Sequence, residues 1–149
     1  MADNFLLLSG KQVAESLKSE LRTRVEKFQK NRGRGPSLHV VLVYVSHKEK
    51  ACVEVGIKSE VWRLPASASQ MEMQQLVERL VKDANVDGIL VQMPLPRDID
   101  SDSILSLIPK EKDVDGFSES AMGALALNRP QAVACTPAGV MEILRHFEI

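Results

Sequence analysis

Four polar residues in the middle of the chain carry side chains suited to proton chemistry in one active site: Tyr44, Lys48, Gln92 and Asp115. Tyr44 and Lys48 are four residues apart, so on a helix their side chains leave the same face one turn apart. A lysine held against a phenol in a partly buried site titrates closer to neutral pH than a solvated lysine does. We therefore predict that Lys48 carries protons and that Tyr44 holds it in place.

Each of these residues also has an ordinary structural explanation. Lys48 lies in a Lys-Glu-Lys run, where most lysines are solvated helix residues. Gln92 interrupts an apolar strand, where a buried amide has to be hydrogen-bonded and can be purely structural. Asp115 precedes Gly116, and an Asp-Gly pair often caps a turn. Tyr44 is the only tyrosine of the chain and could be a core aromatic.

The hydrophobic pattern predicts the elements that position these residues. Apolar residues with helical spacing run from a cap at Ser9 to a break at Gly33, and a capping box at Ser69 and Glu72 begins a second amphipathic helix. Apolar runs predict buried strands, and the segments between them predict further helices. The strands are expected at residues 38–43, 59–64 and 88–91, and these helices at residues 44–56, at 103–108 and from Thr136 and Pro137 onward.

Strands that alternate with helices predict an α/β fold, in which a parallel sheet is covered by helices on both faces. Open parallel sheets bind ligands outside the carboxyl ends of their strands. Tyr44 and Lys48 follow the first strand and Gln92 ends the third, so the topology places all three at one edge. Asp115, in an Asp-Val-Asp-Gly loop, could reach the same edge. We expect the last helix to be buried through Val140, Ile143, Leu144 and Phe147.

Composition favours one domain with a small-molecule partner. The chain has 149 residues and a net charge of −1, which argues against a nucleic-acid or membrane surface as the main partner. The apolar run at residues 5–8 is too short for a signal sequence or a membrane span, so we expect a cytoplasmic protein. Cys52 and Cys135 lack CxxC spacing, which predicts two buried thiols rather than a disulfide or a metal site. Trp62 is interpreted as strand packing, because no basic patch surrounds it.

Three blocks of sequence resemble a known family. They are Tyr-Val-Ser-His-Lys-Glu-Lys-Ala at residues 44–51, Val-Gln-Met-Pro-Leu-Pro at 91–96 and Lys-Asp-Val-Asp-Gly-Phe at 112–117. In this order and spacing they resemble the N-terminal folate-binding domain of the bifunctional methylenetetrahydrofolate dehydrogenase/cyclohydrolase family. The resemblance implies that residues 1–149 form this catalytic domain. It also implies that residues 137–149 begin a connecting helix toward a C-terminal Rossmann domain, which this sequence lacks.

The resemblance implies an enzyme of one-carbon metabolism. Such an enzyme oxidises 5,10-methylenetetrahydrofolate with NADP to 5,10-methenyltetrahydrofolate and hydrolyses that product to 10-formyltetrahydrofolate. Lys48 would be the proton shuttle, with Tyr44 packed on the folate and Gln92 orienting the lysine. The expected partners are tetrahydrofolate derivatives and a second copy of the chain in a homodimer.

The resemblance also implies the residues that bind the substrate. The carboxylate of Asp115 would accept hydrogen bonds from the amino and amide N–H groups of the pterin ring, a donor edge that suits a carboxylate. Prolines hold the segment after Gln92 extended, because a residue before proline avoids the helical region. Met93, Pro94 and Leu95 are therefore expected to form a stiff wall of the pocket.

The chain departs from the family pattern at the first strand. A loop of the type Gly-x-x-x-x-Ser is expected between the first strand and the Tyr-Val helix, whereas Val43 runs directly into Tyr44, and Val41 stands where the serine is expected. Because strand-to-helix connections take two or more residues, we interpret this as a loop omitted between residues 43 and 44.

Two further departures concern the cofactor and the segment after Phe117. The sequence contains no G-x-G-x-x-G nucleotide fingerprint. Residues 118–123 differ from the His-Pro and Asn usually found there, so no function is assigned to them.

Two other functions remain open on the sequence. A truncated module would bind folate or dimerise without turnover. A flavodoxin-like regulatory domain is disfavoured, because such a domain places acidic residues at the end of its first strand and residues 41–43 contain none.

Overall fold

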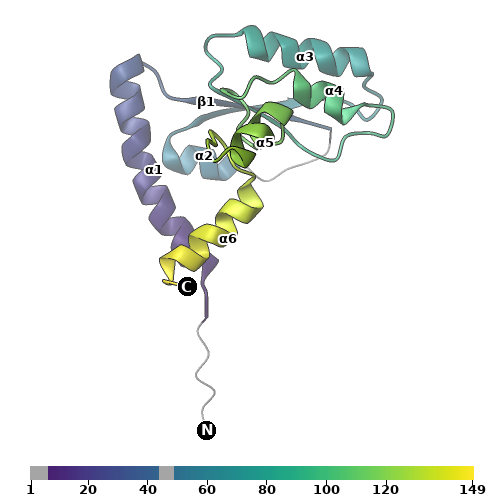
Figure 1. The fold of residues 1–149 in the computed structure, drawn as a ribbon. Coiled ribbons are helices and arrows are strands. Elements are labelled where there is room, and N and C mark those ends of the chain that lie inside the picture. The colour runs from purple at the N-terminus through teal and green to yellow at the C-terminus, as the bar shows by residue number, and fades with distance from the viewer. Residues whose placement is uncertain (1–6, 44–48) are drawn as a thin grey trace.

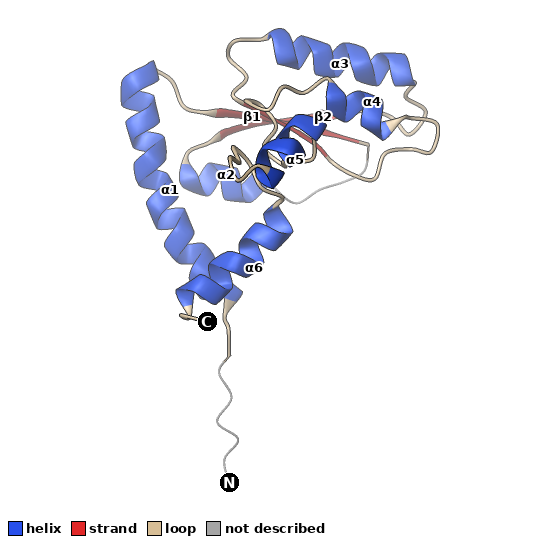
Figure 2. Cartoon of the chain, in the orientation of Figure 1, coloured by secondary structure: helices blue, strands red, loops and turns tan. Residues whose placement is uncertain are grey.

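Strands and helices alternate through the first two thirds of the chain, and two helices follow (Figure 2). The computed structural model describes residues 7–43 and 49–149. The described elements are α1 (Gly10–Arg32), β1 (Ser37–Leu42), α2 (Glu49–Val55), β2 (Lys58–Arg63), α3 (Gln70–Lys82), β3 (Gly88–Val91), α4 (Ser101–Ser106), α5 (Glu119–Ala126) and α6 (Cys135–His146).

The three described strands form one parallel sheet in the order β2-β1-β3. Figure 1 shows α3 and α4 on one face of this sheet and α2 on the other. The predicted α/β fold, a parallel sheet with helices on both faces, is confirmed. The chain leaves β1 toward β2 on one side and later returns to β3 on the other side, which makes the β1/β3 boundary a topological switch point.

The main core lies between the sheet and helices α3 and α4. Successive side chains of a strand point to opposite faces, so Val41, Ile89 and Val91 share one face. These side chains pack against Met73 and Val77 of α3, and both of these α3 side chains are fully buried. The opposite face carries a smaller cluster of Val40, Leu42 and Leu90.

The helix caps confirm several predicted boundaries. Ser9 caps α1 by accepting a hydrogen bond from the backbone N–H of Gln12, and Gly33 ends the helix with φ +69. Ser69 and Glu72 form the reciprocal capping box of α3. The short helix α4 begins two residues earlier than predicted, because the carboxylate of Asp100 serves as its cap.

The last helix differs from the prediction in its start and in its burial. It begins at Cys135, so Pro137 is its third residue rather than its first. None of its residues is fully buried: Val140 is 51% exposed, and Ile143, Leu144 and Phe147 are half-buried. The reason is that α6 does not pack under the sheet: Figure 1 shows its last turns meeting the first turns of α1 at an angle.

Neither cysteine is buried, contrary to the prediction. Cys135 is exposed because it opens this peripheral helix, and Cys52 on α2 is half-buried. The small, weakly polar side chain of cysteine is common in cores, but these two positions lie outside the clusters that fill the sheet faces.

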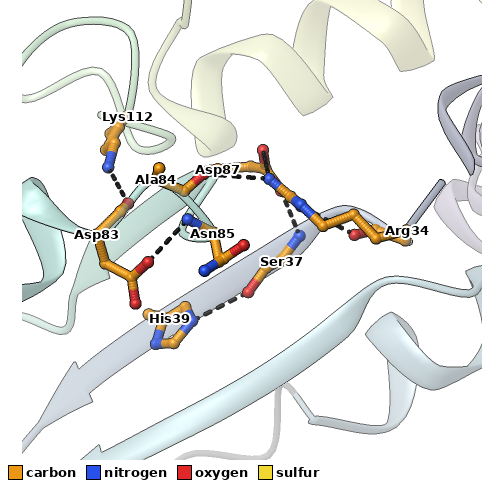
Figure 3. Close-up of polar contacts among 9 residues, drawn as sticks. Arg34, Ser37, His39, Asp83, Ala84, Asn85, Asp87 and Lys112 are labelled. Carbon is orange, nitrogen blue, oxygen red and sulfur yellow. Dashed lines mark hydrogen bonds and ion pairs between the residues drawn. The ribbon is translucent and has the colours of Figure 1, made fainter. Parts of the chain in front are cut away.

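A polar network ties the start of β1 to the start of β3 (Figure 3). The two terminal nitrogens of Arg34, Nη1 and Nη2, donate to the carboxylate of Asp87 at 2.6 and 3.0 Å. The same carboxylate accepts the backbone N–H of Ser37 at 2.8 Å. Partial burial opposes ionisation of Asp87, but these hydrogen bonds outweigh it and lower the pKa of the carboxyl group. The network therefore joins two strands that are 50 residues apart in sequence.

Trp62 packs on the sheet, as predicted, and it also fixes the state of a buried histidine. Its indole N–H donates to Nδ1 of His39 at 2.9 Å, so that nitrogen must be unprotonated. Nε2 of His39 then carries the hydrogen and lies 2.9 Å from the hydroxyl of Ser37. The guanidinium of Arg79 covers the other part of the indole, 4.9 Å from the ring centroid.

The buried histidine predicts a loss of stability in mild acid. Burial lowers the pKa of His39 in the folded state, although the carboxylates of Glu60 and Asp83 act in the opposite direction. In the unfolded chain His39 binds a proton near its ordinary pKa of about 6.5. The contribution of the neutral side chain to the free energy of unfolding is therefore complete above that pH, and it is lost as the pH falls through the pKa of the folded state. Urea denaturation of the wild type should give a lower midpoint at pH 5.5 than at pH 7.5.

The variant His39→Gln isolates this effect, because glutamine keeps hydrogen-bonding groups and does not titrate. We expect a smaller difference between the two pH values in this variant than in the wild type. Loss of carboxylate contacts occurs at lower pH and should be the same in both proteins. Equal pH dependence in the two proteins would remove His39 as the cause.

Candidate functional site

The carboxyl ends of β1 and β3 lie side by side at one edge of the sheet. The backbone N–H of Gln92 donates to the carbonyl of Val41 at 2.8 Å, which joins the ends of the two strands. This is the topological switch point, where open α/β sheets leave a crevice for ligands. The prediction that the first and third strands end at the same edge is confirmed.

Tyr44 and Lys48 lie outside the described residues. The chain is described up to Val43, directly after β1, and again from Glu49, where α2 begins. Both candidates therefore belong to the segment that leaves the β1 end of the switch point. Their arrangement on one helical face stays a prediction. Gly56 closes α2 in the left-handed conformation, with φ +80, as expected.

The segment after β3 combines a half-buried amide with an anchored wall. The side chain of Gln92 donates from Nε2 to the carbonyl of Met93 at 2.9 Å. Met93 is 36% exposed and Pro94 is exposed, whereas Leu95 is buried in the main core. The leucine thus fixes the segment to the sheet, and Met93 and Pro94 present their surfaces outward. The Met93–Pro94 peptide bond is cis.

The loop that carries Asp115 runs along the free edge of β3. Asp113 forms a parallel bridge with Ile89, and the backbone N–H of Ile89 donates to the carbonyl of Lys112 at 2.7 Å. Because the bridge is parallel, the chain proceeds from Asp113 toward the carboxyl end of the sheet. Gly88 makes this approach possible, since a Cβ atom there would lie 2.5 Å from a methyl group of Val114.

The residues around Asp115 in the Lys-Asp-Val-Asp-Gly motif have structural tasks. The ammonium group of Lys112 donates to the carbonyls of Val81 and Asp83, at 2.8 and 2.7 Å, and so caps the end of α3. Gly116 has φ +70, and a side chain there would press on the backbone of Ala132. These contacts hold the motif in place at both of its ends.

Asp113 holds the turn. Its buried carboxylate accepts backbone hydrogen bonds from Asp115 at 3.2 Å, from Gly116 at 2.8 Å and from Ser118 at 2.9 Å. Burial opposes ionisation, but the hydrogen bonds from these three residues outweigh it and lower the pKa of the Asp113 carboxyl group. The turn-capping role considered for Asp115 therefore belongs to Asp113.

Asp115 is left with a half-buried side chain. Within residues 7–43 and 49–149, no hydrogen bond or ion pair engages its carboxylate; only its backbone N–H is bonded, to Asp113. A carboxylate that the fold holds near a ligand edge without using it is available to a ligand that offers hydrogen-bond donors.

The sequence predictions missed Asp113 and the helix that follows it. Helix α5 begins at Glu119, with the buried hydroxyl of Ser118 accepting a hydrogen bond from the backbone N–H of Ala121. The available signal was the Asx spacing, in which an aspartate lies three residues before a glycine and five before a serine. That pattern indicates a turn leading into a helix cap, and it overlaps the motif that contains Asp115.

The described residues offer no metal site and no dinucleotide cradle. Within them, no group of three or more His, Cys, Asp or Glu side chains is placed to hold a metal ion. The starts of α1, α3, α4 and α5 are each occupied by their own capping side chain. No described helix is long and apolar enough to cross a membrane.

The family comparison matches most of the chain. Residues 8–115 match the model of the family described as "Tetrahydrofolate dehydrogenase/cyclohydrolase, catalytic domain". The protein is 44% identical over 152 residues to "Bifunctional protein FolD" of Desulfovibrio desulfuricans and 43% identical over 152 residues to that of Bdellovibrio bacteriovorus. Each match covers 97% of this chain and 53% of the relative, so the chain spans about half the length of the curated relatives it matches.

Solved structures agree with the sequence matches. The bifunctional enzyme FolD (methylenetetrahydrofolate dehydrogenase/cyclohydrolase) of Campylobacter jejuni has a TM-score of 0.88 at 40% identity, covering 97% of this chain and 54% of that one. The N5,N10-methylenetetrahydrofolate dehydrogenase-cyclohydrolase (FolD) of Trypanosoma brucei, solved with NADP cofactor and inhibitor, has a TM-score of 0.89 at 30% identity. That match covers 97% of this chain and 52% of the other.

Proposed function

The chain belongs to the tetrahydrofolate dehydrogenase/cyclohydrolase catalytic-domain family, and from this premise we propose that it is the folate-binding catalytic part of a methylenetetrahydrofolate dehydrogenase/cyclohydrolase. The complete enzyme would oxidise 5,10-methylenetetrahydrofolate and hydrolyse the resulting 5,10-methenyltetrahydrofolate to 10-formyltetrahydrofolate. The observation that carries the proposal is the β1/β3 switch point, where Gln92 ends β3 beside the end of β1 and the Asp115 loop, with its unengaged carboxylate, runs along β3.

The hydrolytic step needs a group that moves protons. Water attacks the methenyl carbon and loses a proton, and a ring nitrogen has to gain one as its bond to that carbon breaks. We propose that Lys48 performs both transfers, with Tyr44 packed on the folate and beside the ammonium group, and with Gln92 orienting the lysine. The joined ends of β1 and β3 support this assignment, because they bring the Gln92 position next to the start of the Tyr44–Lys48 segment.

Substrate binding in this proposal uses the segment that follows β3 and the loop that carries Asp115. Asp115 accepts hydrogen bonds from the amino and amide N–H groups of the pterin ring. Met93 and Pro94 form the wall of the pocket, and the buried Leu95 holds that wall on the core. A fixed wall and a fixed acceptor lower the entropy lost when the ring binds.

Hydride transfer requires NADP, which accepts the hydride from the methylene carbon. The described residues do not fit a dinucleotide: side chains cap the starts of α1, α3, α4 and α5, and no described helix start carries the glycine-rich turn that would let a backbone approach a pyrophosphate. We propose that NADP binds in the part of the enzyme corresponding to the other half of the longer relatives, and that residues 137–149, which comprise most of α6 and the three residues after it, begin the connection to it.

Membership of the family also suggests the compartment, the oligomeric state and the metabolic role of the enzyme. We propose a cytoplasmic homodimer that supplies 10-formyltetrahydrofolate to purine biosynthesis.

The hydrolysis of 5,10-methenyltetrahydrofolate under single-turnover conditions tests the proposal. Enzyme in excess over substrate should accelerate the loss of the methenyl absorbance. Binding of tetrahydrofolate without accelerated hydrolysis would favour a non-catalytic folate-binding module. Absence of both binding and hydrolysis would reject the folate function.

Replacement of Asp115 by asparagine should weaken substrate binding more than it slows the chemistry of the bound state. The amide keeps one acceptor oxygen but turns a donor toward the pterin's own donors. We expect a loss of roughly 1–3 kcal/mol in binding free energy, measured by titration calorimetry with tetrahydrofolate. The matched control is Asp98→Asn at an exposed position, which should bind like the wild type. Unchanged affinity in Asp115→Asn would leave this side chain without a role in binding.

A further inference from the structure

Asp113 is unusual among the polar residues that are buried in the described part of the chain. Those residues are Ser37, His39, Asp113 and Ser118, and Asp113 is the one with a full negative charge. No cation neutralises it there; its hydrogen-bond partners are the backbone N–H groups of Asp115, Gly116 and Ser118 and the hydroxyl of Ser118. Burying a charge is unfavourable unless hydrogen bonds compensate for the lost solvation. The backbone N–H groups of the turn provide this compensation, so the conformation of the turn is tied to the Asp113 carboxylate.

We propose that Asp113 is a positioning residue for substrate binding: it fixes the backbone on both sides of Asp115 and so presents the Asp115 carboxylate to the pterin ring. The inference rests on the proposed function, because it takes Asp115 as the group that binds the ring. Asp113 itself touches no substrate in this arrangement.

The geometry of the turn supports this role. One oxygen, Oδ1, accepts the N–H of Asp115 and the N–H of the next residue, Gly116, while Oδ2 accepts the N–H of Ser118. The peptide groups before and after the Cα atom of Asp115 are therefore both anchored to the same carboxylate. With both peptide groups held, the Cα–Cβ bond of Asp115 has a fixed direction.

The surrounding chain leaves the turn little room to take another shape. Val114 lies on Gly88 of β3, and Gly116 faces the backbone of Ala132, with a hypothetical Cβ atom 3.1 Å from that carbonyl oxygen. Ser118 also caps α5, so the carboxylate links the loop to the start of a helix. Asp113 thus connects Asp115, the proposed binding residue, to the rigid framework of β3 and α5. Holding a binding group in place in this way before the ligand arrives is called pre-organisation.

Equilibrium binding of tetrahydrofolate to four proteins tests the inference: the wild type, Asp113→Ala, Asp115→Asn and the double variant. Asp113→Ala removes both acceptor oxygens, and we expect it to raise the dissociation constant by about tenfold or more, as for the loss of a charge-assisted contact. In the Asp115→Asn background the same change should raise it by less than about threefold, because nothing is left to position.

A matched control separates positioning from general destabilisation. Asp87→Ala removes another partly buried carboxylate that accepts a backbone N–H, but at the amino end of the sheet. It should lower the melting temperature and leave the affinity within about threefold of the wild type. If Asp113→Ala does not fold, Asp113→Asn replaces it, since the amide keeps an acceptor on one side only.

The outcomes distinguish this inference from the proposed function. Wild-type affinity in Asp113→Ala, or losses that multiply in the double variant, would overturn the positioning role while leaving the folate function intact. A wild type that fails to bind tetrahydrofolate would overturn the proposed function and this inference together. A coupled loss, confined to the pair Asp113 and Asp115, is the expected result.

Discussion

Replacement of Lys48 by methionine should abolish hydrolysis of 5,10-methenyltetrahydrofolate while leaving the binding of tetrahydrofolate nearly intact. Methionine keeps most of the apolar stem and removes only the ammonium group. General acid and base catalysis contributes about 10²–10⁴-fold to a rate, so we expect a loss of at least about 100-fold in single-turnover hydrolysis. The measurement follows the methenyl absorbance with enzyme in excess.

The neighbouring Lys50 provides a matched control in the same Lys-Glu-Lys run. Lys50→Met should hydrolyse the substrate at the wild-type rate, since we interpret this lysine as a solvated helix residue. If Lys48→Met retained more than about a tenth of the wild-type rate, Lys48 would not be the proton shuttle. Loss of binding in Lys48→Met, with no further loss of rate for the bound substrate, would assign the lysine to substrate recognition instead.

The 149-residue chain on its own should show no NADP-dependent oxidation of 5,10-methylenetetrahydrofolate, even at high enzyme concentration. Hydride transfer requires the nicotinamide to be held roughly 3–3.5 Å from the methylene carbon, and this positioning supplies much of the rate. The starts of α1, α3, α4 and α5 are occupied by their own capping side chains, and the sequence has no glycine-rich fingerprint to hold a pyrophosphate. The assay follows the appearance of the methenyl absorbance with NADP in excess.

The longer FolD enzyme of Campylobacter jejuni is the positive control for this assay, because this chain covers only 54% of it. That enzyme should form methenyl product under the same conditions. Product formed by the shorter chain alone would mean that the dinucleotide binds to residues assigned here to other tasks. The hydrolysis assay on the same preparation then tells whether an inactive chain is folded and competent for the second step.

Local signals were sufficient to predict most of the sheet and its helices. The third strand runs over Gly88–Val91 as expected, because a short apolar run bounded by Asp87 and Gln92 has few other structures available. The α3 capping box was predicted correctly from two residues, since the reciprocal bonds of Ser69 and Glu72 are formed within one turn. The parallel topology followed from the alternation of elements alone.

Tertiary context accounts for the errors. The apolar spacing of Val140 and Ile143 predicted a buried helix, but a periodic stripe does not say which surface will cover it, and α6 meets α1 only at one end. The exposure of Cys135 has the same origin. Helix α5 was missed because its start depends on a buried cap at Ser118, whose burial depends in turn on Asp113.

The candidate site was predictable to the extent that topology defines it. The apolar run that ends at Gln92 predicts this residue at the carboxyl end of β3, and it lies there. The distinction between Asp113 and Asp115 was not predictable, because both aspartates precede the same glycine and only burial tells which one turns inward. The geometry of Tyr44 and Lys48 stays a prediction.

The Arg34–Asp87 pair and the proposed chemistry lie at opposite ends of the same strands. A strand of the length of β3 separates them, so substitutions at one end do not contact groups at the other. Substitutions at the amino end are therefore expected to change the melting temperature of this protein without changing the chemistry at the carboxyl end. Thermal stability and catalytic activity can therefore change independently in evolution. A lineage that moves to a warmer habitat can gain stability without losing catalytic rate.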